Sequence, residues 1–138
     1  MKNLKLLFGV LLGAVFFTVL SCETGPPKNS RGAQAERGRV FFASHCASCH
    51  GVNADKEKIA SMQKAPPDLT KIMERRKGLT EFPVVEIASF IDGRKAVQLH
   101  KRDMPAWGKY FADEEKLTNE EIKGRMGELI AYLMSIQR

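Results

Sequence analysis

Five residues, Cys46-Ala47-Ser48-Cys49-His50, constrain the fold of this chain more than any other part of its sequence. Two thiols lie three positions apart and an imidazole follows the second, so all three groups come from about one turn of chain. The spacing is typical of three kinds of site: covalent haem attachment, zinc binding and thiol–disulfide exchange. The cellular compartment, the surrounding secondary structure and the presence of further ligands distinguish these three kinds of site.

The first 21 residues have the layout of a bacterial export signal. Lys2 and Lys5 precede an apolar stretch at 6–20 that is interrupted only by Thr18. This stretch is shorter than the roughly 20 residues that cross a bilayer comfortably. The sequence "VLSC" then resembles the lipobox of bacterial lipoproteins, in which the cysteine, here Cys22, becomes the acylated first residue. The alternatives are an uncleaved anchor and a plain secretory signal that leaves Cys22 as a free thiol.

The chain is predicted to have three parts. Residues 1–21 are interpreted as a lipoprotein signal peptide. Residues 22–33 are rich in Pro, Gly, Ser and polar side chains and lack large apolar ones, so they are predicted to be a flexible tether. Residues 34–138 form one small domain, whose limited core would gain from a large apolar cofactor at its centre. The domain is expected to be exported and held at a membrane through Cys22, facing the periplasm or the outer surface.

The charge of the chain is moderately basic. It holds 22 Lys and Arg against 16 Asp and Glu, a formal net charge of +6, and residues 1–21 contribute two lysines and no acids, which leaves +4 for the remainder. Such a balance suits docking to an acidic protein surface. No basic run is interleaved with aromatic residues, so nucleic-acid binding is not expected. A basic run at 71–77 is interpreted either as a solvated helix face or as a docking surface.

Apolar spacing and capping residues predict an all-α domain. Residues 33–46 are expected to form a first helix that runs into the cysteine motif, and residues 118–138 a last helix. Thr118 and Glu121 form a capping box at the start of the last helix. Its apolar residues recur at helical spacing and make one face: Ile122, Met126, Leu129, Ile130, Leu133 and Ile136.

Shorter helices are predicted at three places in the middle of the chain: 53–64, 66–78 and 81–93. In the second of these Asp68 is placed to cap the helix and Gly78 to end it. In the third, Pro83 suits the first helical position and Gly93 ends the helix. Residues 94–116 are predicted to be a long loop with one turn, and loops of that size are often functional.

Haem attachment explains the cysteine motif better than zinc binding or thiol exchange. Cys46 and Cys49 would form thioethers with the two haem vinyl groups, while His50 would reach the iron from the same side. A structural zinc site needs four ligands, and only His45 and His100 are loose candidates for the fourth. A thioredoxin-like pair follows a strand, whereas a helix is predicted here. The sequence therefore predicts one covalently bound haem c.

Met104 is the predicted second axial ligand of the haem iron. Methionine sulfur serves this role in electron-transfer cytochromes. Met104 stands in "KRDMPAWG", where Pro105 stiffens the backbone and enough chain separates it from His50 to reach the opposite face of the ring. His100, the main rival, is interpreted as a surface or propionate-side residue. Trp107 has two interpretations, a propionate contact through its indole N–H and simple core filling. The other methionines are in helical contexts or too near the attachment site: Met62, Met73, Met126 and Met134.

These motifs together resemble class I cytochromes c over nearly all of residues 34–138. Gly38 and Phe42 stand eight and four residues before Cys46, and "CASCHG", "DMPAWG" and the terminal "ELIAYL" follow in the order of that family. The resemblance implies that the first and last helices cross, with Gly38 letting the two backbones approach. It also implies that Phe42 packs by Leu129 and Tyr132.

The resemblance implies further that the carbonyl of Pro67 accepts a hydrogen bond from the ring of His50, which would fix the imidazole. The predicted function is a membrane-tethered carrier of single electrons, not a catalyst of substrate chemistry. Its expected partners are redox proteins, in particular membrane-bound respiratory complexes, of which it would be a mobile carrier or a subunit. The alternative is a haem enzyme or gas-binding protein in which Met104 dissociates to open the sixth position.

Overall fold

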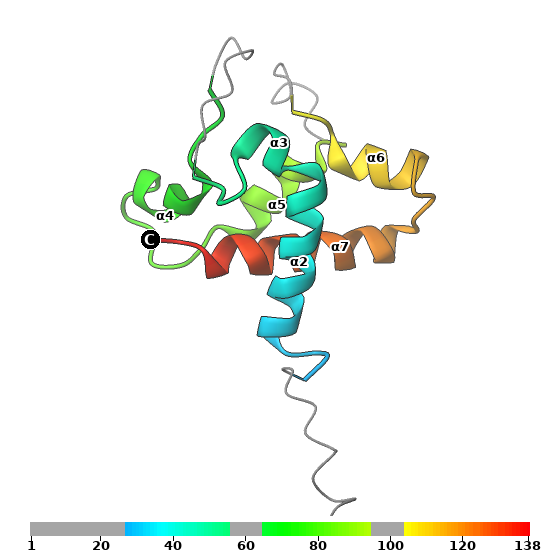
Figure 1. Cartoon of the computed structure of the whole chain (residues 1–138), viewed down its shortest axis with the longest axis horizontal. Helices are drawn as coiled ribbons and strands as arrows, with labels where there is room; N and C mark the ends of the chain where they lie inside the picture. The colour runs from blue at the N-terminus through cyan, green and yellow to red at the C-terminus, as the bar shows by residue number, and fades with distance from the viewer. Residues whose placement is uncertain (1–26, 56–64, 95–103) are drawn as a thin grey trace, which may run out of the picture.

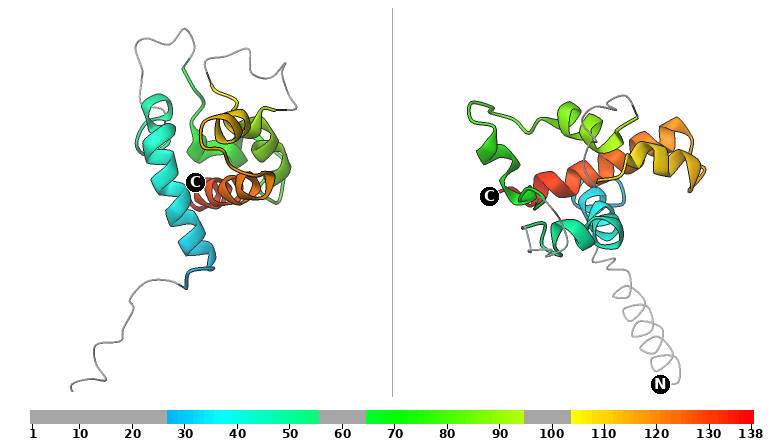
Figure 2. Two further views of the ribbon diagram at one scale, coloured as in Figure 1. Left: turned by 90° about the vertical axis from the view of Figure 1, so that its right-hand side faces the viewer. Right: turned by 90° about the horizontal axis from the view of Figure 1, so that it is seen from above.

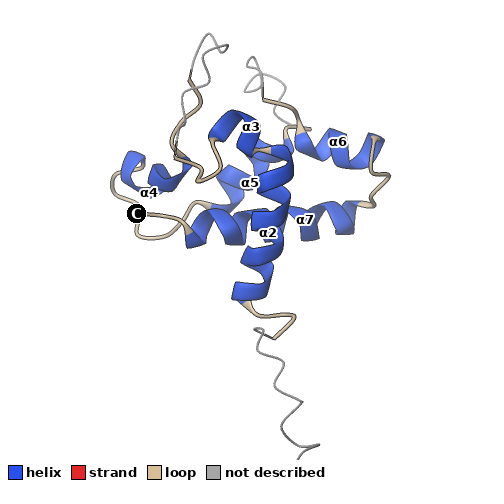
Figure 3. Ribbon diagram, viewed as in Figure 1, coloured by secondary structure: helices blue, strands red, loops and turns tan. Residues whose placement is uncertain are grey.

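The computed structural model describes residues 27–55, 65–94 and 104–138, and Figure 1 shows their course. Within these ranges the regular structure is entirely helical (Figure 3), which confirms the all-α prediction. No helix in them has the length and apolar character that spanning a bilayer requires. The elements are, in chain order, α2 (Arg31–His45), α3 (Ala47–His50), the 3-10 turn η1 (Leu69–Lys71), α4 (Ile72–Arg75), α5 (Val84–Asp92), α6 (Trp107–Asp113) and α7 (Asn119–Ser135).

The centre of the fold is the crossing of α2 and α7, which Figure 1 shows as a steep α2 against a horizontal α7. Gly38 lies at the crossing point and is buried. A Cβ atom added there would stand 2.6 Å from the carbonyl carbon of Glu128 and 3.0 Å from the Cβ of Tyr132. Only a residue without a side chain permits this approach, so the predicted role of Gly38 is confirmed.

The core lies where α2, α5 and α6 pack on α7. Phe42 is 1% exposed, and its ring centroid lies 5.2 Å from that of Tyr132, as predicted. Figure 2, seen from above, shows α2 and α5 on opposite sides of α7. The predicted apolar face of α7 supplies most of the buried residues of that helix, namely Ile122, Met126, Leu129, Ile130 and Leu133, together with Tyr132.

Three of the predicted capping features lie at helix ends in the structure. The side chains of Thr118 and Glu121 each bind the backbone of the other, so the capping box of α7 is confirmed. Asp68 accepts a hydrogen bond from the Thr70 N–H at the start of η1. Gly93 ends α5 in the left-handed conformation, with φ 67°.

Some boundaries differ from the predictions. Helix α2 begins at Arg31, because the Ser30 hydroxyl caps the Ala33 N–H before the predicted start. Helix α4 ends at Arg75, three residues before Gly78, and Pro83 stands at the position just before α5 instead of in its first turn. In the predicted 53–64 helix, residues 53–55 form a turn and the remainder lies outside the described residues.

The prediction of a loop with one turn over residues 94–116 is wrong at its end, where α6 forms. Trp107, Tyr110 and Phe111 are spaced i, i+3 and i+4, so a helix places their rings on one face. The centroid of Trp107 lies 5.3 Å from that of Tyr110, and Phe111 is fully buried. Burial of these aromatic side chains stabilises a helix that is too short to form alone.

Replacing Gly38 by alanine is expected to destabilise the protein by about 1–3 kcal/mol, because the added methyl group has to push α2 away from the backbone of α7. Denaturant unfolding of the purified protein measures the change. Gly124→Ala is the matched control, since nothing lies within 4 Å of a Cβ at that position of α7. That variant should be neutral or stabilising by up to about 1 kcal/mol through helix propensity. Equal effects of the two substitutions would contradict the close crossing.

Candidate haem site

The cysteine motif forms one turn of helix at the end of α2, two helical turns beyond the crossing with α7. Cys46 ends α2, where its N–H donates to the carbonyl of Phe42 at 2.8 Å, and it also precedes α3. The N–H groups of Cys49 and His50 both donate to the carbonyl of Cys46, at 3.1 and 2.9 Å. Residues at i, i+3 and i+4 of a helical turn share one face. The chain thus brings both thiols and the imidazole to one side of α3.

The thiol of Cys46 is buried, with 8% of the residue exposed, whereas Cys49 is half-buried. Burial, together with the neighbouring Cys49, raises the pKa of Cys46 to about 12. Thiol–disulfide exchange needs a lowered pKa and a thiolate at neutral pH. The environment of Cys46 is therefore the opposite of that of a reactive exchange thiol.

His50 carries a buried ring nitrogen that lacks a partner. Its Nδ1 is buried and makes no hydrogen bond within normal geometric limits. Burial lowers the pKa of the ring, while the nearby carbonyl of Pro67 acts more weakly in the opposite direction. The ring is therefore held neutral, which is the state that binds a metal ion. The hydrogen bond from His50 to Pro67 stays a prediction, although the two groups lie close enough to interact.

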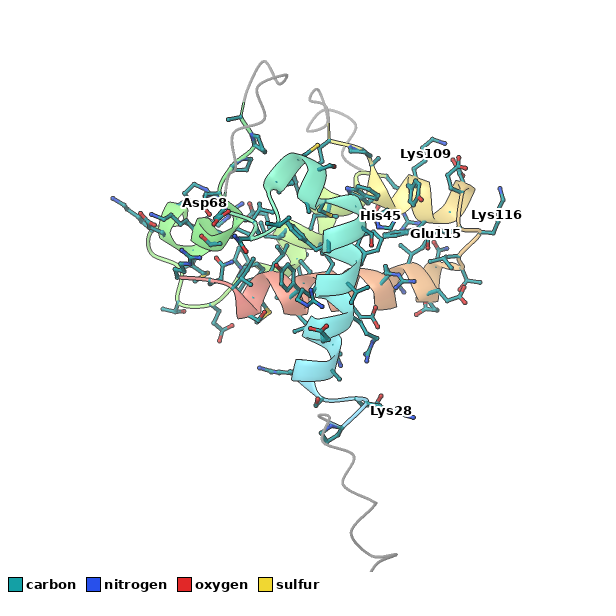
Figure 4. The ribbon with its side chains drawn as sticks, viewed as in Figure 1. Lys28, His45, Asp68, Lys109, Glu115 and Lys116 are labelled. Atoms are coloured by element: carbon teal, nitrogen blue, oxygen red, sulfur yellow. The ribbon has the colours of Figure 1, made fainter. Side chains whose placement is uncertain are left out.

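The segment that carries Pro67 is tied to the chain just after the motif. Ala54 is fully buried in the left-handed conformation, with φ 59°, and its N–H donates to the carbonyl of Gly51. The Leu69 N–H in turn donates to the carbonyl of Ala54 at 2.8 Å. This pair of hydrogen bonds holds the beginning of η1, where Figure 4 marks Asp68, beside the turn that follows His50.

The predicted distal residues lie at the beginning of α6. Met104 is half-buried and packs against the hydrophobic core, and Trp107 is buried as the first residue of α6. Figure 1 shows α3 and the beginning of α6 at the same end of the molecule, above α7. This placement is compatible with haem ligation by Met104 opposite His50, which stays a prediction, as does the propionate contact of Trp107.

An aromatic cluster next to the motif was not predicted from the sequence. The ring of His45 stacks on Phe41 at 4.3 Å and meets the edges of Trp107 at 5.6 Å and Tyr110 at 5.9 Å. His45 is half-buried, and its ring lies between α2 and α6 (Figure 4). The contact between Phe41 and His45 could have been predicted from their spacing of four residues, which places both side chains on one face of α2.

The remaining candidates are spread over the chain. Met126 is buried in the core as predicted for a packing residue, whereas Met134 is 41% exposed. Cys22, His100 and Met62 lie outside the described residues. In the basic run, Arg76 pairs with Glu86 and Lys71 with Glu74, as in an ordinary solvated surface.

A large open groove, about 1290 Å³ in volume, lies elsewhere on the molecule. It runs between the first turns of α2, one side of α5 and α7, and its lining includes Arg31, Ala88 and Ile130. None of the cysteine-motif residues and neither Met104 nor Trp107 lines it. The haem prediction therefore depends on the donor groups of α3 and not on this groove.

Comparison with known proteins decides among the three chemistries of the motif. Within the described ranges no three His, Cys, Asp or Glu side chains, those of the cysteine motif included, are arranged to bind one metal ion among themselves. The family model described as Cytochrome c matches residues 35–137. The chain belongs to the cytochrome c family. No curated protein and no solved structure matched the chain in the other two comparisons.

Cytochromes c bind haem c covalently, and Cys46 and Cys49 have the spacing of the CXXCH attachment motif. The chemistry of the donor set fits this group: a buried thiol, a second thiol three residues later, and a neutral imidazole. Proteins of the family generally transfer electrons, so an electron-carrier role follows from membership. The class I resemblance of the sequence is confirmed.

The free energy of unfolding of this cytochrome c is expected to fall as the pH decreases below about 6.5, the ordinary pKa of a histidine. Burial lowers the pKa of His50 below its ordinary 6.5, and the unfolded chain regains that value. Between the two pKa values the unfolded state binds more protons, so stability is lost as the pH falls, by at most about 1.4 kcal/mol per pH unit. Iron coordination acts in the same direction, because it also requires the neutral ring. Denaturant midpoints that are unchanged across this range would contradict the prediction.

Proposed function

We propose that this cytochrome c is a single-electron carrier in which His50 and Met104 are the axial ligands of one haem iron. The observation that carries the proposal is the α3 turn, which presents Cys46, Cys49 and a neutral His50 together. The buried Nδ1 of His50 supports the assignment, because the predicted hydrogen bond to the nearby carbonyl of Pro67 would orient the ring and leave Nε2 for the iron.

Haem c, when bound, supplies an iron that cycles between the ferric and ferrous states. The two thioethers from Cys46 and Cys49 hold the ring in an exported protein. His50 and Met104 would hold the iron from the two faces of the ring, so that a change of oxidation state would need little rearrangement and no substrate would reach the metal. The ligand pair and the polarity of the groups around the ring would set the reduction potential.

The proposal includes a location at a membrane and partners in that membrane. The basic, apolar beginning of the chain and the "VLSC" sequence support export and acylation at Cys22. A tether from there to α2 would keep the domain near the membrane and raise its effective concentration at membrane-bound respiratory complexes. Labelling with a lipid analogue tests the anchor: the natural chain should incorporate it, Cys22→Ser should not, and equal labelling would contradict acylation at this residue.

Met104→Ala is expected to abolish the weak sulfur-to-iron absorption band of the ferric protein and to lower the reduction potential, because loss of the thioether removes the ligand that favours the ferrous state. A reversible redox titration monitored by absorption measures both effects. Met134→Ala is the matched control, since this methionine is surface-exposed on α7 and should change neither quantity.

Two outcomes would contradict the proposal. Retention of the band in Met104→Ala would show that another residue ligates the iron. Rapid binding of carbon monoxide by the reduced natural protein would show an open or labile sixth position, and would favour the gas-binding or enzymatic alternative.

A further inference from the structure

A charged pair at the end of α5 contacts the first turn of α6. Because Gly93 adopts the left-handed conformation, the chain reverses after α5 and the side chain of Arg94 folds back on Asp92. Arg94 donates from Nε to Asp92 Oδ1 and from Nη2 to Oδ2, both at 2.8 Å, and its backbone N–H also donates to Oδ1 at 3.1 Å. A forked contact of this kind fixes the orientation of both groups.

The same guanidinium reaches a third element. Nη1 of Arg94 donates to the side-chain oxygen of Asn119, the first residue of α7, at 2.9 Å. The side chain of Asp92 is 23% exposed and that of Arg94 34%, so the pair is partly shielded from water. The Asp92–Arg94 pair thus connects the end of α5 to the beginning of α7.

Helix α6 is seated directly on this pair through Gly108, which is buried. A Cβ added to Gly108 would lie 2.5 Å from Asp92 Oδ1 and 2.7 Å from Arg94 Nε. On the other side of the same turn, Trp107 packs edge-on against Phe41 of α2, with ring centroids 5.7 Å apart. The first turn of α6 is therefore held from two sides, by an ion pair and by an aromatic cluster.

We propose that Asp92 and Arg94 are positioning residues for the axial ligand Met104. The inference rests on the proposed function, in which the Met104 sulfur binds the haem iron. Met104 precedes the fixed turn by three residues, with Pro105 between them, so the position of that turn determines where the sulfur is presented. Weakening the ion pair between Asp92 and Arg94 would leave the haem attached and would increase the population of the state in which the Met104 sulfur is dissociated from the iron.

The affinity of the ferric haem protein for imidazole measures this population, because imidazole binds the iron only when the sulfur has left. Asp92→Asn and Arg94→Gln are each expected to increase the apparent affinity about three- to tenfold, in proportion to the rise in the open state. The sulfur-to-iron absorption band should weaken in parallel. Asp92→Glu keeps the charge, so its imidazole affinity should be closer to that of the natural protein than the affinity of Asp92→Asn is.

Arg76→Gln is the matched control, since it breaks an ion pair of the same type, 2.5 Å from Arg76 Nη2 to Glu86 Oε1, at the other end of α5. It should leave imidazole affinity unchanged even if it lowers the denaturant midpoint as much as Arg94→Gln does. Equal imidazole affinities in the control and in the Asp92 and Arg94 variants would overturn the proposal and show that the pair has only a structural role.

A double-mutant cycle between Asp92 and Gly108 tests the contact itself. Gly108→Ala should raise imidazole affinity in the natural protein, because the new methyl group displaces the pair. In the Asp92→Ala background the same substitution should have a smaller effect, since the atoms that it meets first are gone. If Gly108→Ala changes imidazole affinity by the same factor in both backgrounds, the proposed contact of α6 with Asp92 is contradicted.

The electron-carrier proposal and the positioning role of Asp92 and Arg94 are contradicted by different results. Absence of the sulfur-to-iron band in the natural ferric protein would remove Met104 as the ligand, and with it both proposals. A natural protein with the band, together with Asp92 and Arg94 variants that bind imidazole as it does, would leave the electron-carrier proposal standing and overturn the positioning role alone.

Discussion

The close approach of α2 to α7 at Gly38 is the constraint on which the other features of this cytochrome c depend. The backbone of α2 lies against the carbonyl group of Glu128, and the ion pair between Arg37 and Glu128 flanks the same contact. Since α2 is fixed against α7 at this point, its last turn and the α3 turn beyond it are placed in a defined position. The attachment motif is therefore located by a packing contact two helical turns earlier in the chain.

The two halves of the candidate site are held by different means. The proximal half, α3 with Cys46, Cys49 and His50, is the continuation of a long helix that is buried along one side. The distal half depends on a seven-residue helix, α6, which has few hydrogen bonds of its own and is held by Trp107 on one side and by Gly108 on the other. A covalent attachment is thus supported by a rigid element, whereas the proposed exchangeable ligand, Met104, is supported by tertiary contacts.

Local signals in the sequence predicted much of this arrangement. The capping box of Thr118 and Glu121 and the glycine after α5 act within a few residues, so they could be read without knowledge of the fold. The role of Gly38 followed from the family resemblance, because its position relative to Cys46 is characteristic. Helix α6 was missed, since its stability comes from burial of Trp107 and Phe111 against distant elements and not from local propensity.

The side-chain contacts around the distal half could not be predicted from sequence for a related reason. Asp92 and Gly108 are far apart in the chain, and nothing in the local sequence of either indicates that they meet. The stacking of His45 on Phe41 was available from their helical spacing, yet its completion by Trp107 depends on how α6 packs on α2. Contacts within one helix were thus predictable from the sequence, whereas the contacts between helices that position the ligands depend on the fold.

The central claim is that this helical domain carries one haem bound through Cys46 and Cys49. The most direct measurement is the intact mass of the matured protein under denaturing conditions, followed by extraction with acidified organic solvent. The account predicts the mass of the chain plus one haem, with the colour remaining on the protein after extraction and lost in the Cys46→Ala/Cys49→Ala double variant. A colourless chain of unmodified mass, or a haem that leaves with the solvent, would contradict it.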